Sequence, residues 1–538
     1  MTPWPRLSRW RSTATSLVTE RSGVTAALLL VLFALNCAIS VYDDTVTYDE
    51  PGHLEIGSWL LGGSVDHCRD QKMPITALNA LPGAWVKALG LSLSDKNLLW
   101  ISRLPTVCFA VVVGYFVFEW SRKLYGGRGG LFSLLLFVFC PTTIAHARMA
   151  ANDLYCAGFS LLAVHSFLRY LDAPSRRSLL RAAALMGVAQ LTKHTALLLF
   201  PVLAVTFVVR TWARWRPSPG SASWPPRRIA RDGVVYVLVV WAVLNVGYGL
   251  RPHFATLAED SAWLQANTEF VPATPRQYDS ELAKIPIPLP RAYVEAILFG
   301  QYFNRTGRGH GPDYLFGELR PLGWWYYFPV AFALKTPLPT LLVLGMAIVV
   351  TVRKKRWGLG SDEGVLLLVP FVVLVFFCSA CSADIGVRYL LPIMPFLYVF
   401  AGQVVAFTPG RWSTGWNTSV LVLSVWLPIT SLSYFPHYIS YFNEISWNRL
   451  LLYESLSDSN LQWGQDDGYL QQYIDTHPGR VTVNPESPVT GTVIVDTNRL
   501  TGVTSDLETY RWLREGHTPV SRAAYSWLVY EIPERQSP

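Results

Sequence analysis

The sequence predicts a helical protein that crosses a membrane many times and ends in a small α/β domain. Of its 538 residues, 51% are hydrophobic and 15% are charged, whereas soluble domains carry about 25% charged residues. The hydrophobic residues also form repeated runs that are long enough to cross a bilayer, and these runs stop near residue 435. We therefore expect a transmembrane module over residues 1–435 and a small domain over residues 436–538.

Eleven crossings account for the apolar runs. Four arginines precede the first run, so we expect the N-terminus in the cytoplasm, where Lys and Arg collect. The predicted helices cover residues 24–41, 104–120, 130–145, 154–171, 182–209, 233–248, 325–351, 365–383, 391–407 and 419–435. The run 182–209 has basic residues on both sides, so we expect two legs that meet near Lys193 and His194. This topology puts loops 43–98 and 251–321 and the C-terminal domain on the outer face of a plasma (inner) membrane.

The C-terminal domain shows the alternating patterns of a mixed fold. We expect a helix from about residue 465 that ends near His477-Pro478-Gly479. Strand-like stretches cover residues 480–484, 492–497 and 527–532, and a helix is expected over residues 506–516.

Charge and cysteine content exclude two other classes. The net charge is +8, but the basic residues lie in short loops between apolar runs, and no nucleic-acid-binding motif accompanies them, so we expect no nucleic-acid partner. The seven cysteines are scattered, and five of them lie inside or beside apolar runs, so neither a zinc site nor a disulfide framework is indicated.

The loop directly after the first helix, residues 46–82, holds the densest set of candidate functional residues. Asp49 and Glu50 are followed by His53 and Glu55, and then by Lys72 just before Pro74. Ionisable groups beside membrane segments are costly and are functional candidates by default. On the expected topology the outer helix ends hold several more such residues, namely Arg148, Asp153, Lys193 and Arg388, the last with Tyr389 beside it.

Carboxylates and cations at one membrane face suit a transfer reaction. A carboxylate there can take a proton from an acceptor hydroxyl, and cations can hold an anionic leaving group and stabilise its developing charge. The sequence has no dinucleotide-binding fingerprint and no Gly-rich phosphate loop. A lipid-linked phosphate donor therefore fits better than a nucleotide-linked one.

Each candidate also has a structural interpretation. Asp49-Glu50 precedes Pro51 and could cap a helix, and Asp49, Glu50, His53 and Glu55 could instead bind a divalent metal, although their spacing matches no known zinc pattern. Asp153 follows Asn152 where a helix cap is expected, and Lys72 could reach to lipid head groups. Lys193 could be held by backbone carbonyls, and Arg388-Tyr389 could be an interfacial anchor. Weaker candidates are Asp458, Asp466, His310 and Asp313.

Six motifs in order resemble one family over nearly the whole length. They are YDEPGHLEIGSWLL, QKMPITALNALPG, ARMAANDLY, LTKHTALLLFP, IGVRYLLPIMPFL and DSNLQWGQD. Together they are similar to motifs of the GT-C superfamily of polyprenyl-phosphate-sugar-dependent glycosyltransferases, in particular bacterial relatives of protein O-mannosyltransferase and of the lipid A aminoarabinose transferase. Two positions depart from the family pattern: Met73 replaces a proline and Gln462 an aspartate.

The resemblance implies a GT-C fold and an inverting transfer without a nucleotide. Asp49 and Glu50 fall on the catalytic motif, and Asp49 would deprotonate the acceptor, which could be a protein, a lipid or a glycan. Lys72 and Arg388 would hold the polyprenyl phosphate, while Glu50 and Asp153 would orient the acceptor or the sugar. The remaining substrate-binding candidates are Tyr389, His53, Lys193 and Arg148. The resemblance requires no cofactor, although a divalent metal stays possible.

Two rival functions are a transporter or flippase of lipid-linked saccharides and a non-catalytic membrane scaffold. Transporters usually contain internal repeats with broken helices at the midplane, but the sequence shows no convincing repeat and its charges gather at one face. A scaffold would leave the acidic loop unexplained.

Overall fold

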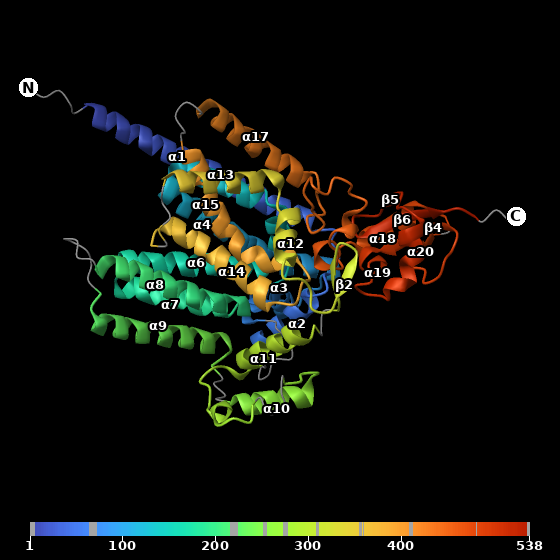
Figure 1. The fold of residues 1–538 in the computed structure, drawn as a ribbon, viewed down its shortest axis with the longest axis horizontal. Helices are drawn as coiled ribbons and strands as arrows, with labels where there is room; N and C mark the ends of the chain where they lie inside the picture. The colour runs from blue at the N-terminus through green and yellow to red at the C-terminus, as the bar shows by residue number, and fades with distance from the viewer. Residues whose placement is uncertain are drawn as a thin grey trace, which may run out of the picture.

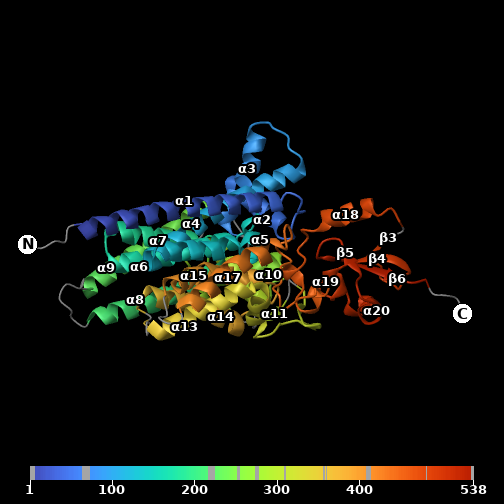
Figure 2. The same ribbon diagram turned by 90° about the horizontal axis from the view of Figure 1, so that it is seen from above.

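A computed structural model of the protein describes residues 6–63, 73–215, 224–250, 255–272, 278–307, 311–354, 358, 360–407, 413–479 and 481–534. Most of these residues are helical, and the long helices lie roughly side by side along one axis (Figure 1). The first turns of α1 lie at one end of the bundle and the strands β4 and β6 lie beyond the other end (Figures 1 and 2).

The bundle helices are α1 (Arg6–Ser40), α4 (Asp95–Val138), α5 (Pro141–Ala147), α6 (Asp153–Asp172), α7 (Arg176–Gln190), α8 (Leu199–Trp215), α9 (Pro226–Gly247), α12 (Tyr327–Lys335), α13 (Leu338–Lys354), α14 (Asp362–Ala380), α15 (Met394–Ala401), α16 (Gln403–Ala406) and α17 (Ser413–Leu432). The segments between them carry α2 (Glu50–Leu61), α3 (Ala77–Ala88), α10 (Leu257–Asn267), α11 (Arg291–Thr306), β1 (Asp313–Leu315), β2 (Glu318–Arg320) and the 3-10 turns η1 (Pro74–Thr76), η2 (His194–Leu198), η3 (Glu281–Lys284) and η4 (Val387–Ile393). After α17 come η6 (Leu452–Glu454), η7 (Asp458–Asn460), α18 (Asp467–Thr476), β3 (Val481–Val483), β4 (Gly491–Asp496), α19 (Thr497–Leu500), η8 (Leu507–Tyr510), α20 (Arg511–Gly516), β5 (Ser521–Arg522) and β6 (Trp527–Ile532).

Helix α4 folds back on itself at Gly126. Gly126 has a φ of 80°, outside the helical region. The Ser133 hydroxyl donates to Ser121 Oγ at 2.7 Å, whereas twelve residues of one continuous helix span about 18 Å. The two legs are therefore antiparallel neighbours, as the separate helices predicted over 104–120 and 130–145 require. The first leg begins at Asp95, earlier than predicted, because Ser94 caps it by accepting a hydrogen bond from the Asn97 amide.

The run 182–209 makes two legs, as predicted. Lys193, at the turn between α7 and α8, pairs with Asp153 at the start of α6. Arg210, near the far end of α8, is 3.0 Å from Asp172 at the opposite end of α6. The chain therefore runs along α6 twice in opposite directions, and the turn at Lys193 lies at the same end as Asp153.

The protein is a multi-pass membrane protein. In the described part of the chain, seven helices are long and apolar enough to cross a membrane, or eight if a bent pair counts as one span. Helix α4 counts once in that number despite its two legs, and α7 and α17 are not in it. These three additions would bring the number to the eleven that the sequence predicts, so eleven crossings stay a prediction.

Three predicted elements differ from the structure because of prolines and polar turns. The single helix expected over 325–351 is wrong: α12 and α13 meet at an angle of 111°, with Pro337 at the break, where no backbone N–H is available to continue the helix. The helix expected over 130–145 ends at Val138, and Pro141 starts the separate helix α5. The segment expected to be a loop over 251–321 contains α10, α11 and the β1–β2 hairpin. The sequence analysis predicted none of these elements, because the polar and aromatic residues of this segment form no long apolar run.

The C-terminal sheet has the strand order β3-β4-β6-β5. Strands β3 and β4 are parallel, while β6 pairs antiparallel with β4 and with β5. Strands β3, β4 and β6 and helix α18 lie where the sequence predicts them, and the predicted second helix appears as η8 followed by α20. One buried apolar cluster extends from Phe33 of α1 through Phe137 of α4 to Tyr530 of β6, so the sheet packs onto the bundle without a solvent gap.

Candidate active site

Asp49 and Arg388 form an ion pair between two segments that are far apart in the sequence. Arg388 Nη1 donates to Asp49 Oδ2 at 2.6 Å, and the two side chains are 11% and 17% exposed. Asp49 is the residue before α2, whose first turn contains Pro51, a residue suited to starting a helix. Arg388 belongs to η4, and its guanidinium carbon lies 4.2 Å from the centre of the Trp463 ring. This partly exposed pair can still meet a substrate.

A second ion pair lies beside the first. Lys193 Nζ is 2.5 Å from Asp153 Oδ1. The same ammonium lies 4.3 Å from the centre of the Tyr389 ring, and the Arg388 guanidinium lies 5.5 Å from that centre. Tyr389 therefore joins the two cations, so the structure brings Asp49, Arg388, Tyr389, Lys193 and Asp153 into one site, as expected.

Glu50 lies next to this site but is fully engaged elsewhere. Its side chain is 0% exposed and accepts from Arg103 Nε at 2.8 Å and from Arg103 Nη2 at 2.6 Å. The amides of Thr47 and Ala150 donate to the same carboxylate, both at 2.9 Å. Burial raises the pKa of Glu50, but the Arg103 charge and these hydrogen bonds outweigh it and hold the pKa below its usual value. Because its oxygens are all occupied, the structure favours a positioning role for Glu50, and its expected catalytic role stays a prediction.

Arg148 also holds the loop rather than facing the pair at Asp49. It is fully buried, its Nη2 lies 2.9 Å from Asp44 Oδ2, and its Nη1 donates to the Ser40 carbonyl at 2.5 Å. Burial raises the pKa of Asp44 to about 6, and the Arg148 charge opposes this rise. Arg148 thus anchors the end of α1 and the chain that leads to Asp49, so its expected substrate-binding role becomes a positioning role.

Other expected site residues are placed as follows. Lys72 and His310 lie outside the described residues. His53 is buried on the inner face of α2, whereas Glu55 is exposed. Across the described ranges no group of three His, Cys, Asp or Glu side chains could hold a metal ion. Of the metal candidates in this loop, Glu50 is bound by Arg103 and Glu55 points to solvent, so they do not converge.

Asp384, in the loop before Arg388, and Asp313 of β1 form a buried carboxyl pair. The Asp384 amide donates to Asp313 Oδ1 at 2.8 Å, and the Trp324 amide donates to Asp384 Oδ2 at 2.5 Å. Burial and the neighbouring Asp384 charge raise the pKa of Asp313 to about 9, and burial raises the pKa of Asp384 to about 7. The bond from the Asp384 amide to Asp313 ties the β1–β2 hairpin to the Arg388 loop.

Sequence reasoning missed Arg103, Trp463 and Asp384. Arg103 could have been found, because it is a cation inside an apolar run, which is costly and needs a partner. No comparable sequence pattern marks Trp463 or Asp384, because residues in irregular loops follow no hydrophobic periodicity.

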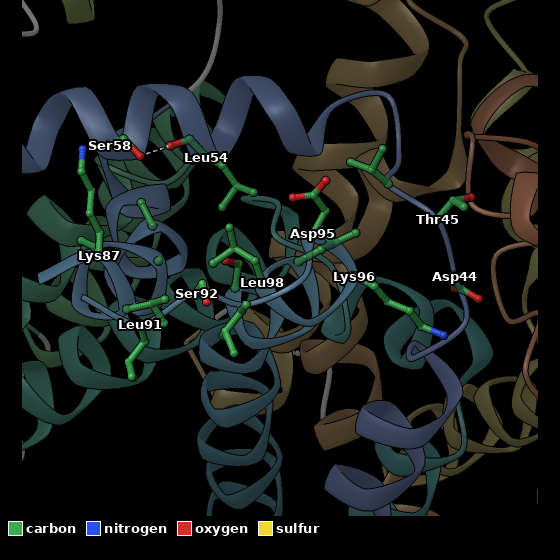
Figure 3. A pocket seen from close by; sticks show the side chains of 18 of the residues that line it. Asp44, Thr45, Leu54, Ser58, Lys87, Leu91, Ser92, Asp95, Lys96 and Leu98 are labelled. Carbon is green, nitrogen blue, oxygen red and sulfur yellow. Dashed lines mark hydrogen bonds between the residues drawn. The ribbon is translucent and has the colours of Figure 1, made fainter. Parts of the chain in front are cut away.

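A cavity of about 1380 Å³ lies against the other face of α2 (Figure 3). Leu54, Ser58 and Leu61 line it from α2, and Lys87 of α3 and Lys96 of α4 line other parts of it. Asp49 is not among its lining residues. We place the chemistry at Asp49 because the two ion pairs converge there, whereas Lys96 in the cavity is already 2.7 Å from Asp43.

Comparison with known proteins gives a family for the middle of the chain. Residues 79–221, about a quarter of the length, match the family model of dolichyl-phosphate-mannose-protein mannosyltransferases. This match indicates a glycosyltransferase. The matched residues include three cations and one carboxylate in or next to the candidate site, namely Arg103, Arg148, Lys193 and Asp153.

Solved structures resemble this glycosyltransferase only loosely. ArnT from Cupriavidus metallidurans bound to undecaprenyl phosphate is 15% identical, with 94% of this chain and 99% of that chain covered and a TM-score of 0.47. The apo state of the same protein gives 14% identity, coverage of 96% and 100%, and a TM-score of 0.49. The S. cerevisiae Pmt1-Pmt2 complex bound to its sugar donor is 17% identical, with 42% of this chain and 33% of that chain covered and a TM-score of 0.34. Because all three scores are below 0.5, none of these likenesses carries the argument. A comparison with curated protein sequences gives no match.

Proposed function

We propose that this glycosyltransferase moves a sugar from a polyprenyl-phosphate carrier to an acceptor hydroxyl, with inversion, at the outer face of the membrane. The observation that carries the proposal is the convergence of Asp49 with Arg388 and Lys193 around Tyr389. The family description, which names a dolichyl-phosphate sugar, supports a lipid-linked donor.

In the proposed reaction Asp49 is the general base. Its carboxylate takes the proton of the acceptor hydroxyl while the acceptor oxygen forms a bond to the anomeric carbon. The bond from that carbon to the phosphate oxygen breaks, and its electron pair leaves with the lipid phosphate. Attack from the side opposite the phosphate inverts the anomeric centre.

The cations take the phosphate in this scheme. Arg388 offers a fork of N–H donors that suits a phosphate, and Lys193 adds a second positive charge that can stabilise the leaving group. Asp153 holds Lys193 in place through its ion pair at 2.5 Å. Because Arg388 is bound to Asp49 in this structure, the donor phosphate would compete for the guanidinium and leave the carboxylate available for the acceptor. Lys72, outside the described residues, is assigned to the same phosphate by its motif.

Charge supports the proposed orientation. The end of the bundle at Arg169 and Arg210 carries cations paired with Asp362. The Lys193–Asp153 pair lies at the opposite end of α6, and the C-terminal sheet lies beyond that end of the bundle (Figure 1). Cations favour the cytoplasmic side, which supports the proposal that Asp49 and the sheet lie outside. The test is a protease or thiol-labelling assay on sealed cells, in which a cysteine introduced at exposed Thr504 should react with an impermeant reagent; protection of that position would contradict the orientation.

A further inference from the structure

One short segment after α17, residues 458–465, contacts both of the chain segments that carry the ion pair. On one side it holds the loop of Arg388. Ser459 Oγ donates to the Ile385 carbonyl at 2.5 Å, and the Val387 amide donates to Asn460 Oδ1 at 3.0 Å. These two bonds bracket Gly386, and a Cβ at Gly386 would lie 2.3 Å from Ser459 Oγ. A side chain at this position would therefore have to displace the Ser459 hydroxyl.

On its other side the segment holds the chain that leads to Asp49. The Tyr48 amide donates to the Trp463 carbonyl at 2.9 Å, and the Thr45 amide donates to the Gln465 carbonyl at the same distance. The Thr45 hydroxyl donates to the Gly464 carbonyl at 2.5 Å. Tyr48 directly precedes Asp49, just as Val387 directly precedes Arg388, so both members of the pair are fixed at the preceding residue.

The segment is itself anchored in the bundle. Asn460 is fully buried, and its Nδ2 donates to the Tyr327 hydroxyl of α12 at 2.7 Å. Lys335 at the end of α12 is 2% exposed and donates to the Asn460 carbonyl at 2.5 Å and to the Ile439 carbonyl at 2.8 Å. A buried amino group that donates to two carbonyls is costly to disturb, because a lost bond leaves a desolvated polar group. Buried hydrogen bonds therefore fix this segment to the bundle.

We propose that residues 459–465 are positioning residues that set the distance between Asp49 and Arg388, so that the chain beyond the bundle is required to form the donor site. The inference rests on the proposed function only in calling this pair the reactive one. All of these hydrogen bonds form without the sugar donor, and the Trp463 ring contacts the guanidinium of Arg388. Geometry at the reacting groups matters to within fractions of an ångström, so loosening the segment weakens donor binding although its backbone bonds never meet the donor.

The first test measures amide hydrogen exchange and lipid binding in the full-length protein. In Ser459→Ala and Asn460→Ala, peptides that cover residues 383–391 should exchange faster than in the parent, because the Ile385 carbonyl and the Val387 amide, respectively, lose their partners, while strand β4 should stay unchanged. Affinity for undecaprenyl phosphate, measured in detergent, should weaken about tenfold, the effect of one lost hydrogen bond of about 1.4 kcal/mol. Ser505→Ala, which removes a hydroxyl-to-carbonyl bond to Arg499 of 2.7 Å, is the matched control and should change neither quantity.

Unchanged exchange in both variants overturns the proposal, and so does faster exchange with full affinity. If the parent protein shows no saturable binding of undecaprenyl phosphate, the donor-site assignment fails, and the exchange result alone then decides whether the segment holds the loop.

A second test uses the close approach at Gly386. Gly386→Ala should lower the thermal unfolding midpoint and speed exchange of the Arg388 loop, because the new methyl group meets Ser459 Oγ. Adding Ser459→Ala removes that oxygen, so the double variant should recover part of the loss. Losses that simply add would show that the two residues are independent, and the proposal would then fall.

Discussion

Removal of Arg103 tests the structural role assigned to Glu50. The ion pair between them is almost fully buried, with exposures of 2% and 0%, and both Glu50 oxygens accept from the same guanidinium. Arg103→Gln would leave the Glu50 carboxylate in the interior with only the Thr47 and Ala150 amides as partners. Breaking one side of such a pair costs about 3–5 kcal/mol. Glu50→Gln, which keeps the shape but removes the charge, should cost a similar amount because the Arg103 charge is then uncompensated.

The assay is unfolding of the purified protein by SDS titration in mixed micelles, completed as a double-variant cycle. Because the two residues serve each other, the double variant Glu50→Gln/Arg103→Gln should be less destabilised than the sum of the two singles by about 3 kcal/mol. The matched control is the pair Lys96–Asp43, which is 2.7 Å long but about half exposed. Lys96→Gln should cost less than about 1 kcal/mol. Additive losses at Glu50 and Arg103 would refute the reasoning, and a stable Glu50→Gln protein without turnover would return Glu50 to the catalytic residues.

Three further predictions concern the donor cations and the carboxyl pair. Lys193→Met removes the charge that Asp153 holds, and it should weaken undecaprenyl phosphate binding by at least about tenfold; equal affinity would take Lys193 out of the phosphate site. Lys72→Ala should raise the donor KM more than it lowers kcat, and an unchanged donor KM would argue against its assignment. Asp313→Asn should reduce the loss of folding stability that the parent shows as pH rises. The pKa values of Asp313 and Asp384 are both raised in the folded state, so the folded protein keeps protons that the unfolded chain releases above pH ~4. Stability of the parent is therefore lost as pH rises towards about 7 and then towards about 9. Thermal unfolding between pH 5 and 9 measures this, and a variant that keeps the slope of the parent would contradict it.

Residue type and position along the chain predicted a face at which ionisable groups gather, but not which of them form pairs. Asp49, Arg388, Lys193 and Asp153 lie at helix ends of one face, and a charge at such a place needs a partner, so their convergence follows from the topology. The reversal near Lys193 was likewise predictable from the basic residues on both sides of the run.

The roles within the site were not predictable in the same way. Glu50 and Asp49 are neighbours in the sequence, yet one points to Arg103 inside the bundle and the other to Arg388, and no local pattern distinguishes them. The bend between α12 and α13 depends on how the segment packs, since a proline can kink a helix or end it. The bonds from Asn460 to the Arg388 loop join residues 73 apart through irregular backbone, where no periodicity gives the register.

Turnover of Asp49→Asn tests the central claim most directly. The assay reconstitutes the protein in liposomes with a total membrane extract of its host, which supplies both polyprenyl-phosphate sugars and acceptors, and follows release of free polyprenyl phosphate by mass spectrometry, so the acceptor need not be identified. Loss of a general base lowers the rate by about 10²–10⁴-fold, while affinity for undecaprenyl phosphate should be kept because Arg388 remains. Asp43→Asn, an exposed carboxylate of the same loop paired with Lys96, should turn over like the parent. Parent-level release of polyprenyl phosphate by Asp49→Asn would contradict the account.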